Sequence, residues 1–456
     1  MMGQHSRSES LFYYFRLEDH LPENHLPENH LLRLIDRHVS FDFVRAKLKD
    51  SYSEMGRPSI DPELLLRILL VGYLYGVSSE RKLVEELRMH LAWRWFTGLG
   101  FDQEIPHHST FSKNRHGRFH ESNLFEQLFE EIVARCLEAG LVQGDHLSVD
   151  GSFIQADAST SSRIPREQLA EAAQVKRTGR EYLADLEQEN APTDEPLPQQ
   201  ERVSTTDPDA IYATKGGRPA ELGYYDNYLI DNDSCVIVGV QASAARLSQE
   251  STAARTLITR FTEQRGRAPQ TLAADTTYGN GELLHWLQER GITAHIRVKE
   301  NPLAKSDLYG IEKFTYMPDS NRYTCPEGKE LTYVGINARN RVHVYQATRK
   351  RCRDCPQKAL CTTGSYRQIA IHVHEPARQW ARDLAKTPAF AKAQRARRKV
   401  EALFAELKNQ IGLRRVRLRR MKFVREQFFL AATAQNLKRL VRFLAQTPKQ
   451  PLPATT

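Results

Sequence analysis

The chain has 456 residues, 40% hydrophobic and 27% charged, which is ordinary for a globular protein of about two or three domains. It contains no run of 18 or more uninterrupted apolar residues, and its first residues lack the apolar segment of a secretory signal, so we expect a cytoplasmic protein that spans no membrane. The net charge of +9 favours a polyanionic partner, and six cysteines are too few for a disulfide scaffold at this length.

Residues 1–140 are predicted to form a helical domain. Several segments begin with a capping polar residue and continue with apolar residues at helical spacing: 61–76, 78–90, 108–119 and 122–140. Short helices with a basic one among them are typical of helix-turn-helix DNA binders, but any small helical bundle has the same pattern. DNA contact by this domain is therefore left open.

The first part of a mixed α/β domain is predicted over residues 141–300. Strand-like alternation in HLSVDGSFIQAD is followed by a polar excursion over residues 159–217. The segments GYYDNYLID and CVIVGVQAS, on either side of a turn, predict a hairpin. A helix, a strand ending in TLAAD, a second helix and another strand complete the pattern, which is that of a mixed α/β fold.

Residues 301–380 interrupt this pattern and are predicted to be an inserted cysteine-rich module. Cys352 and Cys355 form a C-x2-C pair, Cys361 follows, and Cys325 lies upstream in CPEG. Four thiolates in this spacing could hold one tetrahedral zinc ion, which would be structural. The alternative is four reduced cysteines that pack as small hydrophobic side chains.

Residues 381–445 are predicted to complete the α/β domain with a long helix near residues 390–411 and a final helix. The Pro-rich tail, residues 446–456, is predicted to be disordered. From Lys392 to Lys422 the segment holds twelve Lys or Arg against two acids. This run is either a solvated helix face or a surface for a polyanion.

Two aspartates end apolar strand-like runs. Asp150 follows LSV and precedes Gly151, and Asp275 ends TLAAD. A carboxylate in such a place is costly to bury unless it faces solvent or a cation, and metal-assisted phosphodiester cleavage needs converging carboxylates. Each aspartate alone is equally well explained as a turn residue at a strand end.

The third candidate carboxylate, Glu401, is predicted from helix geometry. An apolar stripe runs along the helix, formed by Val400, Leu403, Phe404, Leu407 and Ile411. Arg397, Glu401 and Lys408 lie along one edge of that stripe, whereas Glu406 is predicted to point away on the far side. Glu401 could therefore reach a metal while its basic neighbours hold phosphates, or it could form a plain surface ion pair with Arg397.

These residues carry a family resemblance. The order of the three acids, with VDGSF, AADTTYG and RRKVEALFAELKNQIGLRRVRLRR around them, resembles the DDE transposases of bacterial insertion sequences. The resemblance covers nearly the whole chain, in the branch with a helical N-terminal domain and a zinc-ribbon-like insertion. It implies a ribonuclease-H-like core. Further similarity lies in STTDPDA, GYYDNYLID and the closing AQNLKRL.

The resemblance also implies a site. Asp150, Asp275 and Glu401 would bind two Mg²⁺ ions, for which Mn²⁺ could substitute. Arg397 and Lys408 would belong to the family's signature around the last acid, in which a tyrosine position is here Gln394. The basic residues that would hold the DNA backbone are Arg397, Lys408, Arg414, Arg415, Arg417, Arg419 and Arg420.

The implied function is metal-dependent cleavage of double-stranded DNA at the ends of an insertion sequence, followed by strand transfer into target DNA. A transposase must bring two ends together, so a homodimer on DNA and association with the nucleoid are expected. Two alternatives stay open: a DNA-binding protein without catalysis, and a Mg²⁺-dependent nuclease without strand joining.

Overall fold

The computed structural model describes residues 26–53, 55, 59–100, 103–188, 201–214, 219–245, 247–300 and 308–446. Most of the predicted disordered tail and parts of the polar excursion lie outside these residues. The chain divides into two compact units. Unit 1 comprises residues 1–269 and 395–456, and unit 2 comprises residues 270–394.

The N-terminal region of unit 1 is helical, as predicted. Its helices are α2 (Leu31–His38), α3 (Phe43–Leu48), α4 (Pro62–Leu74), α5 (Glu80–Met89), α6 (Leu91–Thr97), α7 (His108–Asn114) and α8 (Leu124–Glu138). Helix α4 begins with Asp61, whose side chain accepts the Glu63 N–H, and with Pro62 at its first turn. The helix predicted over 108–119 is regular only to Asn114, because the backbone leaves helical angles at Gly117.

The sheet of unit 1 is antiparallel. Its strands are β1 (His146–Gln155), β4 (Ile211–Ala213), β5 (Glu221–Asp231) and β6 (Ile237–Ala244). Strand β5 lies between β1 on one side and β4 and β6 on the other, and Asp150 is directly opposite Tyr228. Helix α11 (Leu247–Arg265) packs against one face of these strands.

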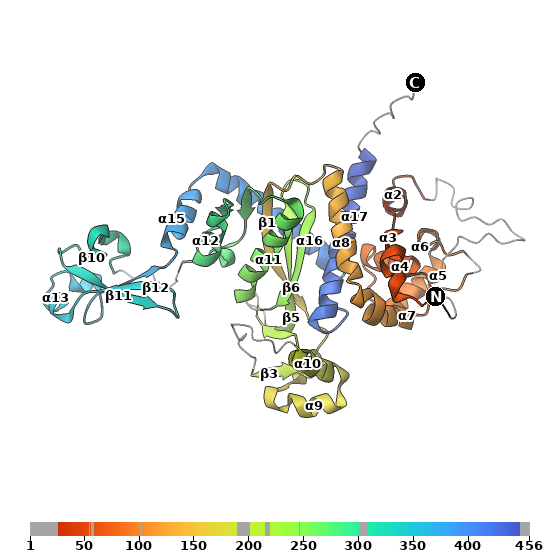
Figure 1. Cartoon of the computed structure of the whole chain (residues 1–456), viewed down its shortest axis with the longest axis horizontal. Helices are drawn as coiled ribbons and strands as arrows, with labels where there is room; N and C mark the ends of the chain where they lie inside the picture. The colour runs from red at the N-terminus through yellow and green to blue at the C-terminus, as the bar shows by residue number, and fades with distance from the viewer. Residues whose placement is uncertain are drawn as a thin grey trace, which may run out of the picture. The chain divides into compact units, whose positions relative to one another are not determined.

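The other face of the unit 1 sheet is covered by the C-terminal part of α16 (Pro388–Asn409), where Phe404 stacks on Tyr228 with ring centroids 4.7 Å apart. Helix α17 (Met421–Gln446) packs against α8, α2, α4 and β6 (Figure 1). The Asn436 side chain accepts the Ile237 N–H at 2.9 Å and donates to the Ile237 carbonyl at 2.7 Å. The AQNLKRL segment therefore fixes α17 to the edge strand β6.

The excursion that follows β1 forms a small substructure of its own. It contains β2 (Arg163–Pro165), α9 (Leu169–Val175), α10 (Arg177–Gln188) and β3 (Arg202–Ser204). Strands β2 and β3 form a two-stranded antiparallel sheet.

Unit 2 begins with two parallel strands, β7 (Thr271–Ala273) and β8 (Thr293–His295), joined by α12 (Gly281–Glu289). A five-stranded antiparallel sheet follows, in the order β13-β12-β11-β10-β9. Its strands are β9 (Thr315–Met317), β10 (Arg322–Thr324), β11 (Glu330–Asn337), β12 (Val342–Gln346) and β13 (Gln368–His372). The remaining helices of unit 2 are α13 (Arg349–Arg353), α14 (Lys358–Cys361) and α15 (Glu375–Leu384).

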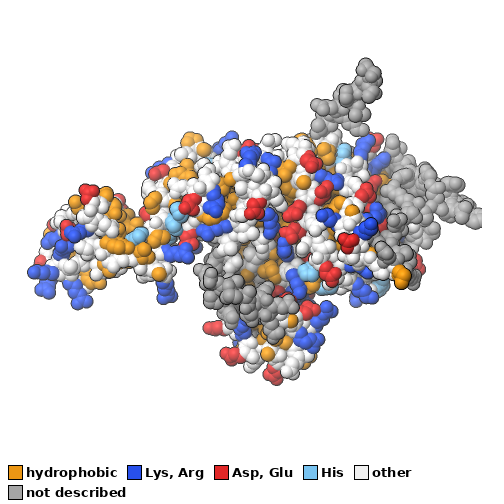
Figure 2. Space-filling view, in the orientation of Figure 1, with side chains coloured by type: hydrophobic (Ala, Val, Ile, Leu, Met, Phe, Trp, Pro, Cys, Tyr) orange, Lys and Arg blue, Asp and Glu red, His pale blue; other side chains and the backbone are white. Residues whose placement is uncertain are grey.

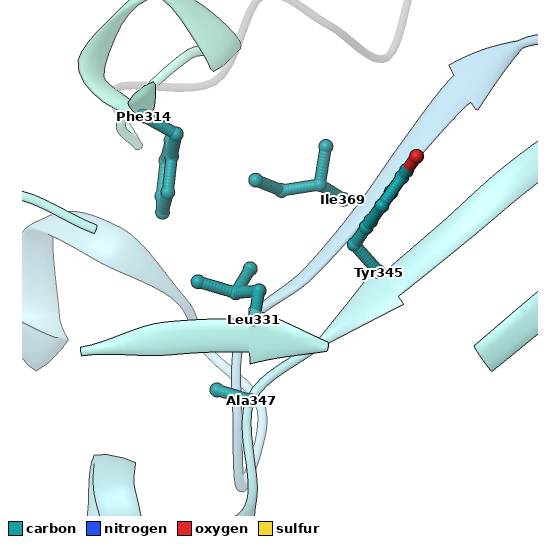
Figure 3. Packing of buried hydrophobic residues seen from close by; sticks show 5 residues of the cluster. All are labelled: Phe314, Leu331, Tyr345, Ala347 and Ile369. Atoms are coloured by element: carbon teal, nitrogen blue, oxygen red, sulfur yellow. The ribbon is translucent and has the colours of Figure 1, made fainter. Parts of the chain in front are cut away.

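The five-stranded module has a small core, formed by Phe314, Leu331, Tyr345, Ala347 and Ile369 (Figure 3). Hydrophobic side chains are visible on the surface of this module in Figure 2. Its exposed large apolar residues include Tyr316, Met317, Tyr333, Val334, Ile336 and Leu360. Through the described part of the chain, none of the helices combines the length and the apolar character that crossing a bilayer requires.

Candidate active site

Asp150 lies in the middle of β1, at the face of the sheet that α16 covers. Its side chain is 17% exposed, and its Oδ1 accepts the N–H of Gly151 at 2.8 Å. A Cβ atom at Gly151 would lie 2.7 Å from the Asn227 side-chain oxygen on the neighbouring strand. A side chain at this position would therefore clash with Asn227 of β5. Glycine avoids that clash directly after Asp150.

Arg397 connects Asp150 to Glu401. One guanidinium nitrogen of Arg397 donates to Asp150 Oδ2 at 3.1 Å, and the other lies 3.5 Å from Glu401 Oε1. Glu401 is 61% exposed, whereas Asp150 and Arg397 are mostly buried. The structure thus brings two of the three predicted carboxylates to one guanidinium group, and the predicted Arg397–Glu401 ion pair is present as part of this arrangement.

The placement of Glu401 follows from the predicted apolar stripe on α16. All five of its members are buried: Val400, Leu403, Phe404, Leu407 and Ile411. Burial of that stripe against the sheet turns the edge that carries Arg397 and Glu401 toward β1.

Glu406 lies apart from the edge that carries Arg397 and Glu401. Its carboxylate forms ion pairs with Lys438 at 3.3 Å and Arg439 at 2.8 Å. Burial acts to raise the pKa of Glu406, but the charge and hydrogen bond of Arg439, with Lys438, outweigh it and lower the pKa. The helical wheel did not identify these partners, which belong to α17.

Asp275 belongs to unit 2 and lies two residues after the end of β7. Its Oδ1 accepts the Thr277 N–H at 2.7 Å, so it caps the short turn formed by residues 276–278. Nearby, a Cβ at Gly279 would lie 1.9 Å from the Arg297 carbonyl oxygen. The AADTTYG segment is therefore a tight, capped turn in which the glycine has no substitute without a shift of the backbone.

Gln394, at the family's tyrosine position, has a structural role within unit 2. Its side-chain amide donates to the carbonyl of Ala274 at 3.0 Å and to that of His295 at 2.6 Å. These carbonyls lie just beyond β7 and at the end of β8. Gln394 therefore holds the chain next to Asp275 in place.

The predicted DNA-binding arginines after α16 differ in exposure. Arg414, Arg415 and Arg419 are exposed, and Arg417 is half-buried with its guanidinium 4.4 Å from the centre of the Tyr73 ring. The Gln155 N–H donates to the Arg414 carbonyl at 3.1 Å, and the Val416 N–H donates to the Gln155 carbonyl at 2.8 Å. The basic segment is thereby attached to the end of β1, the strand of Asp150.

Arg420 is buried, which does not suit the surface role that the resemblance implies for it. Its guanidinium is 2.7 Å from Asp209 and 2.8 Å from Asp185, and its N–H donates to Asp207 at 3.0 Å. Its backbone is left-handed, with φ of 74°. These contacts close the excursion, including its STTDPDA segment, onto the start of α17.

Asp226 is a buried carboxylate that the sequence reasoning missed. It lies on the same face of β5 as Tyr228, is fully buried, and neither of its oxygens has a hydrogen-bond partner of normal geometry among the described residues. Burial raises its pKa well above the usual value, although the Tyr228 hydroxyl and the Lys408 charge oppose this. Half-buried Lys408 therefore lies close enough to the buried Asp226 for its charge to act on that carboxyl group. A polar residue between two tyrosines in GYYDNYLID was the available signal.

The four cysteines of the module lie near one another in unit 2. Cys325, Cys352 and Cys361 pack against the small core, and Cys325 Sγ accepts the Lys329 N–H at 3.3 Å. Burial raises the pKa of the Cys361 thiol, Arg367 lowers it, and the other three thiols raise it further. Within the described ranges, no group of three or more His, Cys, Asp or Glu side chains could hold a metal ion as placed.

Comparison with known proteins gives two family matches. The family described as a transposase domain (DUF772) matches residues 20–117, and that described as a transposase DDE domain matches residues 324–441. The second range contains Glu401 and the four cysteines, whereas Asp150 and Asp275 lie outside both. No curated protein matches the chain.

Among solved structures, the chain is similar to a chain in the cryo-EM structure of the piggyBac transposase synaptic complex with hairpin DNA. The identity is 10% and the TM-score 0.32, over 92% of this chain and 82% of that chain. At so low a TM-score, no property of that protein is assigned to this chain.

Proposed function

We propose that the chain is the DDE transposase of a bacterial insertion sequence, which cuts double-stranded DNA at the ends of the element and joins them to target DNA; the two transposase family matches support this. The observation that carries this proposal is the contact of Arg397 with both Asp150 and Glu401. Two acids far apart in the sequence, on a strand and on a late helix, meet at one cationic group.

The site that we propose consists of Asp150, Glu401 and Asp275, with Asp275 included on the strength of the family resemblance. All the donors are carboxylate oxygens, which fits Mg²⁺, with Mn²⁺ as a possible substitute. When bound, two such ions would activate the attacking oxygen and stabilise the leaving oxygen. The ribonuclease-H-like assignment of the α/β core and the predicted domain limits (1–140, 141–300, 301–380, 381–445) belong to the same proposal.

The chain's own residues have distinct parts in this scheme. Gly151 donates its N–H to Asp150 and so fixes the orientation of that carboxylate on the strand. Glu401 is exposed and can change rotamer to meet a ligand. Arg397 contacts both acids, and its guanidinium has the donor geometry that would also suit a DNA phosphate.

The decisive experiment is cleavage of a labelled duplex that carries the element's terminal repeat, in Mg²⁺ and in EDTA. We expect the wild type to cut at the repeat boundary only with the metal, and Asp150→Asn, Asp275→Asn and Glu401→Gln each to abolish cutting while binding persists. Asp233→Asn, in an exposed turn, is the matched control and should cut normally. Specific binding without cutting under any metal would favour the non-catalytic alternative, and cutting without joined products would favour a nuclease.

We also infer that Cys325, Cys352, Cys355 and Cys361 hold a structural zinc ion once their side chains reorient toward one another. The support is their mutual proximity and the N–H donated to Cys325 Sγ, which suits a thiolate. Metal analysis of the purified protein tests this, with about one zinc per chain expected. A homodimer on DNA, expected because two ends must meet, is tested by the mass of the complex with a terminal repeat.

A further inference from the structure

A cavity of about 290 Å³ lies in unit 1 where α4, α5 and α7 meet residues 417–427. Its floor is partly apolar, with Leu69, Tyr73 and Leu83, and hydroxyl groups of Ser78, Ser79 and Ser112 are among its lining. None of the residues proposed to bind metal lines it. It joins the helical N-terminal region to the basic segment that follows α16.

The charges that line this cavity are mostly positive. Arg81, Arg115 and Arg417 contribute three guanidinium groups, and the only carboxylate among the lining residues, Glu80, is already ion-paired with Arg115. The Arg417 guanidinium donates to the Ile411 carbonyl at 3.0 Å and lies 4.4 Å from the centre of the Tyr73 ring, while its buried Nε has no hydrogen-bond partner among the described residues. A donor of this kind, facing no acceptor of the protein, is costly unless a ligand or water accepts from it.

The start of α5 adds further donors to the same cavity. Ser79 caps this ten-residue helix, and its carbonyl accepts the first intrahelical bond, from the Leu83 N–H at 2.8 Å. The N–H groups of the first turn have no acceptor within the helix, and the partial positive charge of the helix end adds to that of the guanidinium groups. Donors from two separate parts of the chain therefore line one cavity, and Glu80 is the one carboxylate among its lining residues.

We propose that this cavity binds a phosphate group of the DNA backbone. The inference rests on the proposed function, because it requires that the chain bind DNA, and it names one place where the backbone is held. Guanidinium groups, hydroxyls and helix N–H groups are all donors to an oxyanion, and the volume suits a phosphate group with its adjoining sugar atoms better than a base pair. Arg417 thereby has a specific role, distinct from that of the open surface arginines.

The test is the binding of a labelled terminal-repeat duplex, measured by fluorescence anisotropy across a range of salt concentrations. Arg81→Gln should weaken binding several-fold and reduce the slope of log affinity against log salt by about 0.9, the value for one lost phosphate contact. Lys82→Gln removes the same charge from the next exposed residue, outside the cavity, and should leave the slope unchanged. Ser112→Asp places a carboxylate at the cavity and should weaken binding further, whereas Ser109→Asp on the same helix should not.

The outcomes separate this proposal from the proposed function. If the wild type binds and cuts the duplex but Arg81→Gln and Ser112→Asp behave like their controls, the cavity is not a DNA contact and the proposal is overturned alone. If the wild type binds no duplex, both fail. A thermal shift with inorganic phosphate that Arg81→Gln removes, without any change in duplex affinity, would assign the cavity to a free phosphate compound and also overturn the proposal.

Discussion

The sheet of unit 1 and the five-stranded sheet of unit 2 are both antiparallel, yet they are stabilised in different ways. In β5 ten of eleven residues are buried, because α11 packs on one face and α16 on the other. In β11 only Leu331 is buried, and the module's core has five members. In unit 1, hydrophobic burial is sufficient to hold the strand of Asp150 in place. The module buries much less apolar surface, and its cysteines pack against its small core.

The largest effect is therefore expected from Cys352→Ser, which should unfold the module while unit 1 stays folded. A structural zinc ion contributes folding free energy directly, so its loss lowers stability most in a module with a small hydrophobic core. Limited proteolysis followed by mass spectrometry should show new cuts within residues 315–372, and a chelator should reproduce them in the wild type.

Cys235→Ser is the control, since Cys235 lies in a turn of unit 1. If the wild-type module is folded without zinc, its small core is sufficient for folding. The two sheets would then both be stabilised by hydrophobic burial alone.

In unit 1 the strongest electrostatic dependence is expected at Glu406. Glu406→Gln leaves Lys438 and Arg439 largely buried without their carboxylate, and should lower the free energy of unfolding by about 3 kcal/mol. Because the pKa of Glu406 is lowered in the folded state, its stabilisation is complete above its unfolded pKa and is lost as the pH falls through the folded pKa. The difference between variant and wild type should thus shrink in acid.

Urea unfolding at several pH values measures this difference. Glu131→Gln breaks a half-exposed ion pair with Arg135 and should change the stability by less than about 1 kcal/mol. Equal effects of the two variants would mean that the Glu406 network is no stronger than a surface pair.

Gly151→Ala tests how tightly the unit 1 sheet is packed. The added Cβ would meet the Asn227 side-chain oxygen at 2.7 Å, so that side chain must move, at a cost of about 2 kcal/mol and with impaired cleavage. Gly364→Ala in the module meets its nearest atoms only at 3.6 Å and should be tolerated. Thermal unfolding and cleavage rates of both variants decide this, and a neutral Gly151→Ala would contradict the tight packing.

The smallest expected effect is a gain, from Asp226→Asn. A pKa raised in the folded state means that Asp226 supports folding when protonated, and that this support is lost as the pH rises above its unfolded pKa of about 3.9. The variant should therefore melt roughly 2–4 °C higher than the wild type near pH 7 and equal it near pH 4. Asp233→Asn, which is exposed, should leave the melting temperature unchanged.

The elements that carry the candidate site could be predicted from the sequence. Alternation in HLSVDGSFIQ and the apolar stripe from Val400 to Ile411 are strong local patterns, and both elements form where expected. The contacts that could not be predicted involve partners far away in the chain. Glu406 meets residues of α17, and Arg420 meets Asp185 and Asp209 of the excursion.

Asp226 and the lining of the cavity could not be predicted for the same reason. The burial of Asp226 arises because α16 covers its face of the sheet, and the cavity combines the start of α5 with Arg417. A pattern within one segment gives the face of a helix or strand, but not which other segment packs on it.

The pairing of Gln155 with Arg415 sets how far the basic segment lies from Asp150 along β1. Gln155 follows Asp150 by five residues, which at about 3.3 Å per residue is roughly 17 Å along the strand. The backbone hydrogen bonds of Gln155 therefore hold the exposed Arg414 and Arg415 at a set distance from Asp150 along the strand.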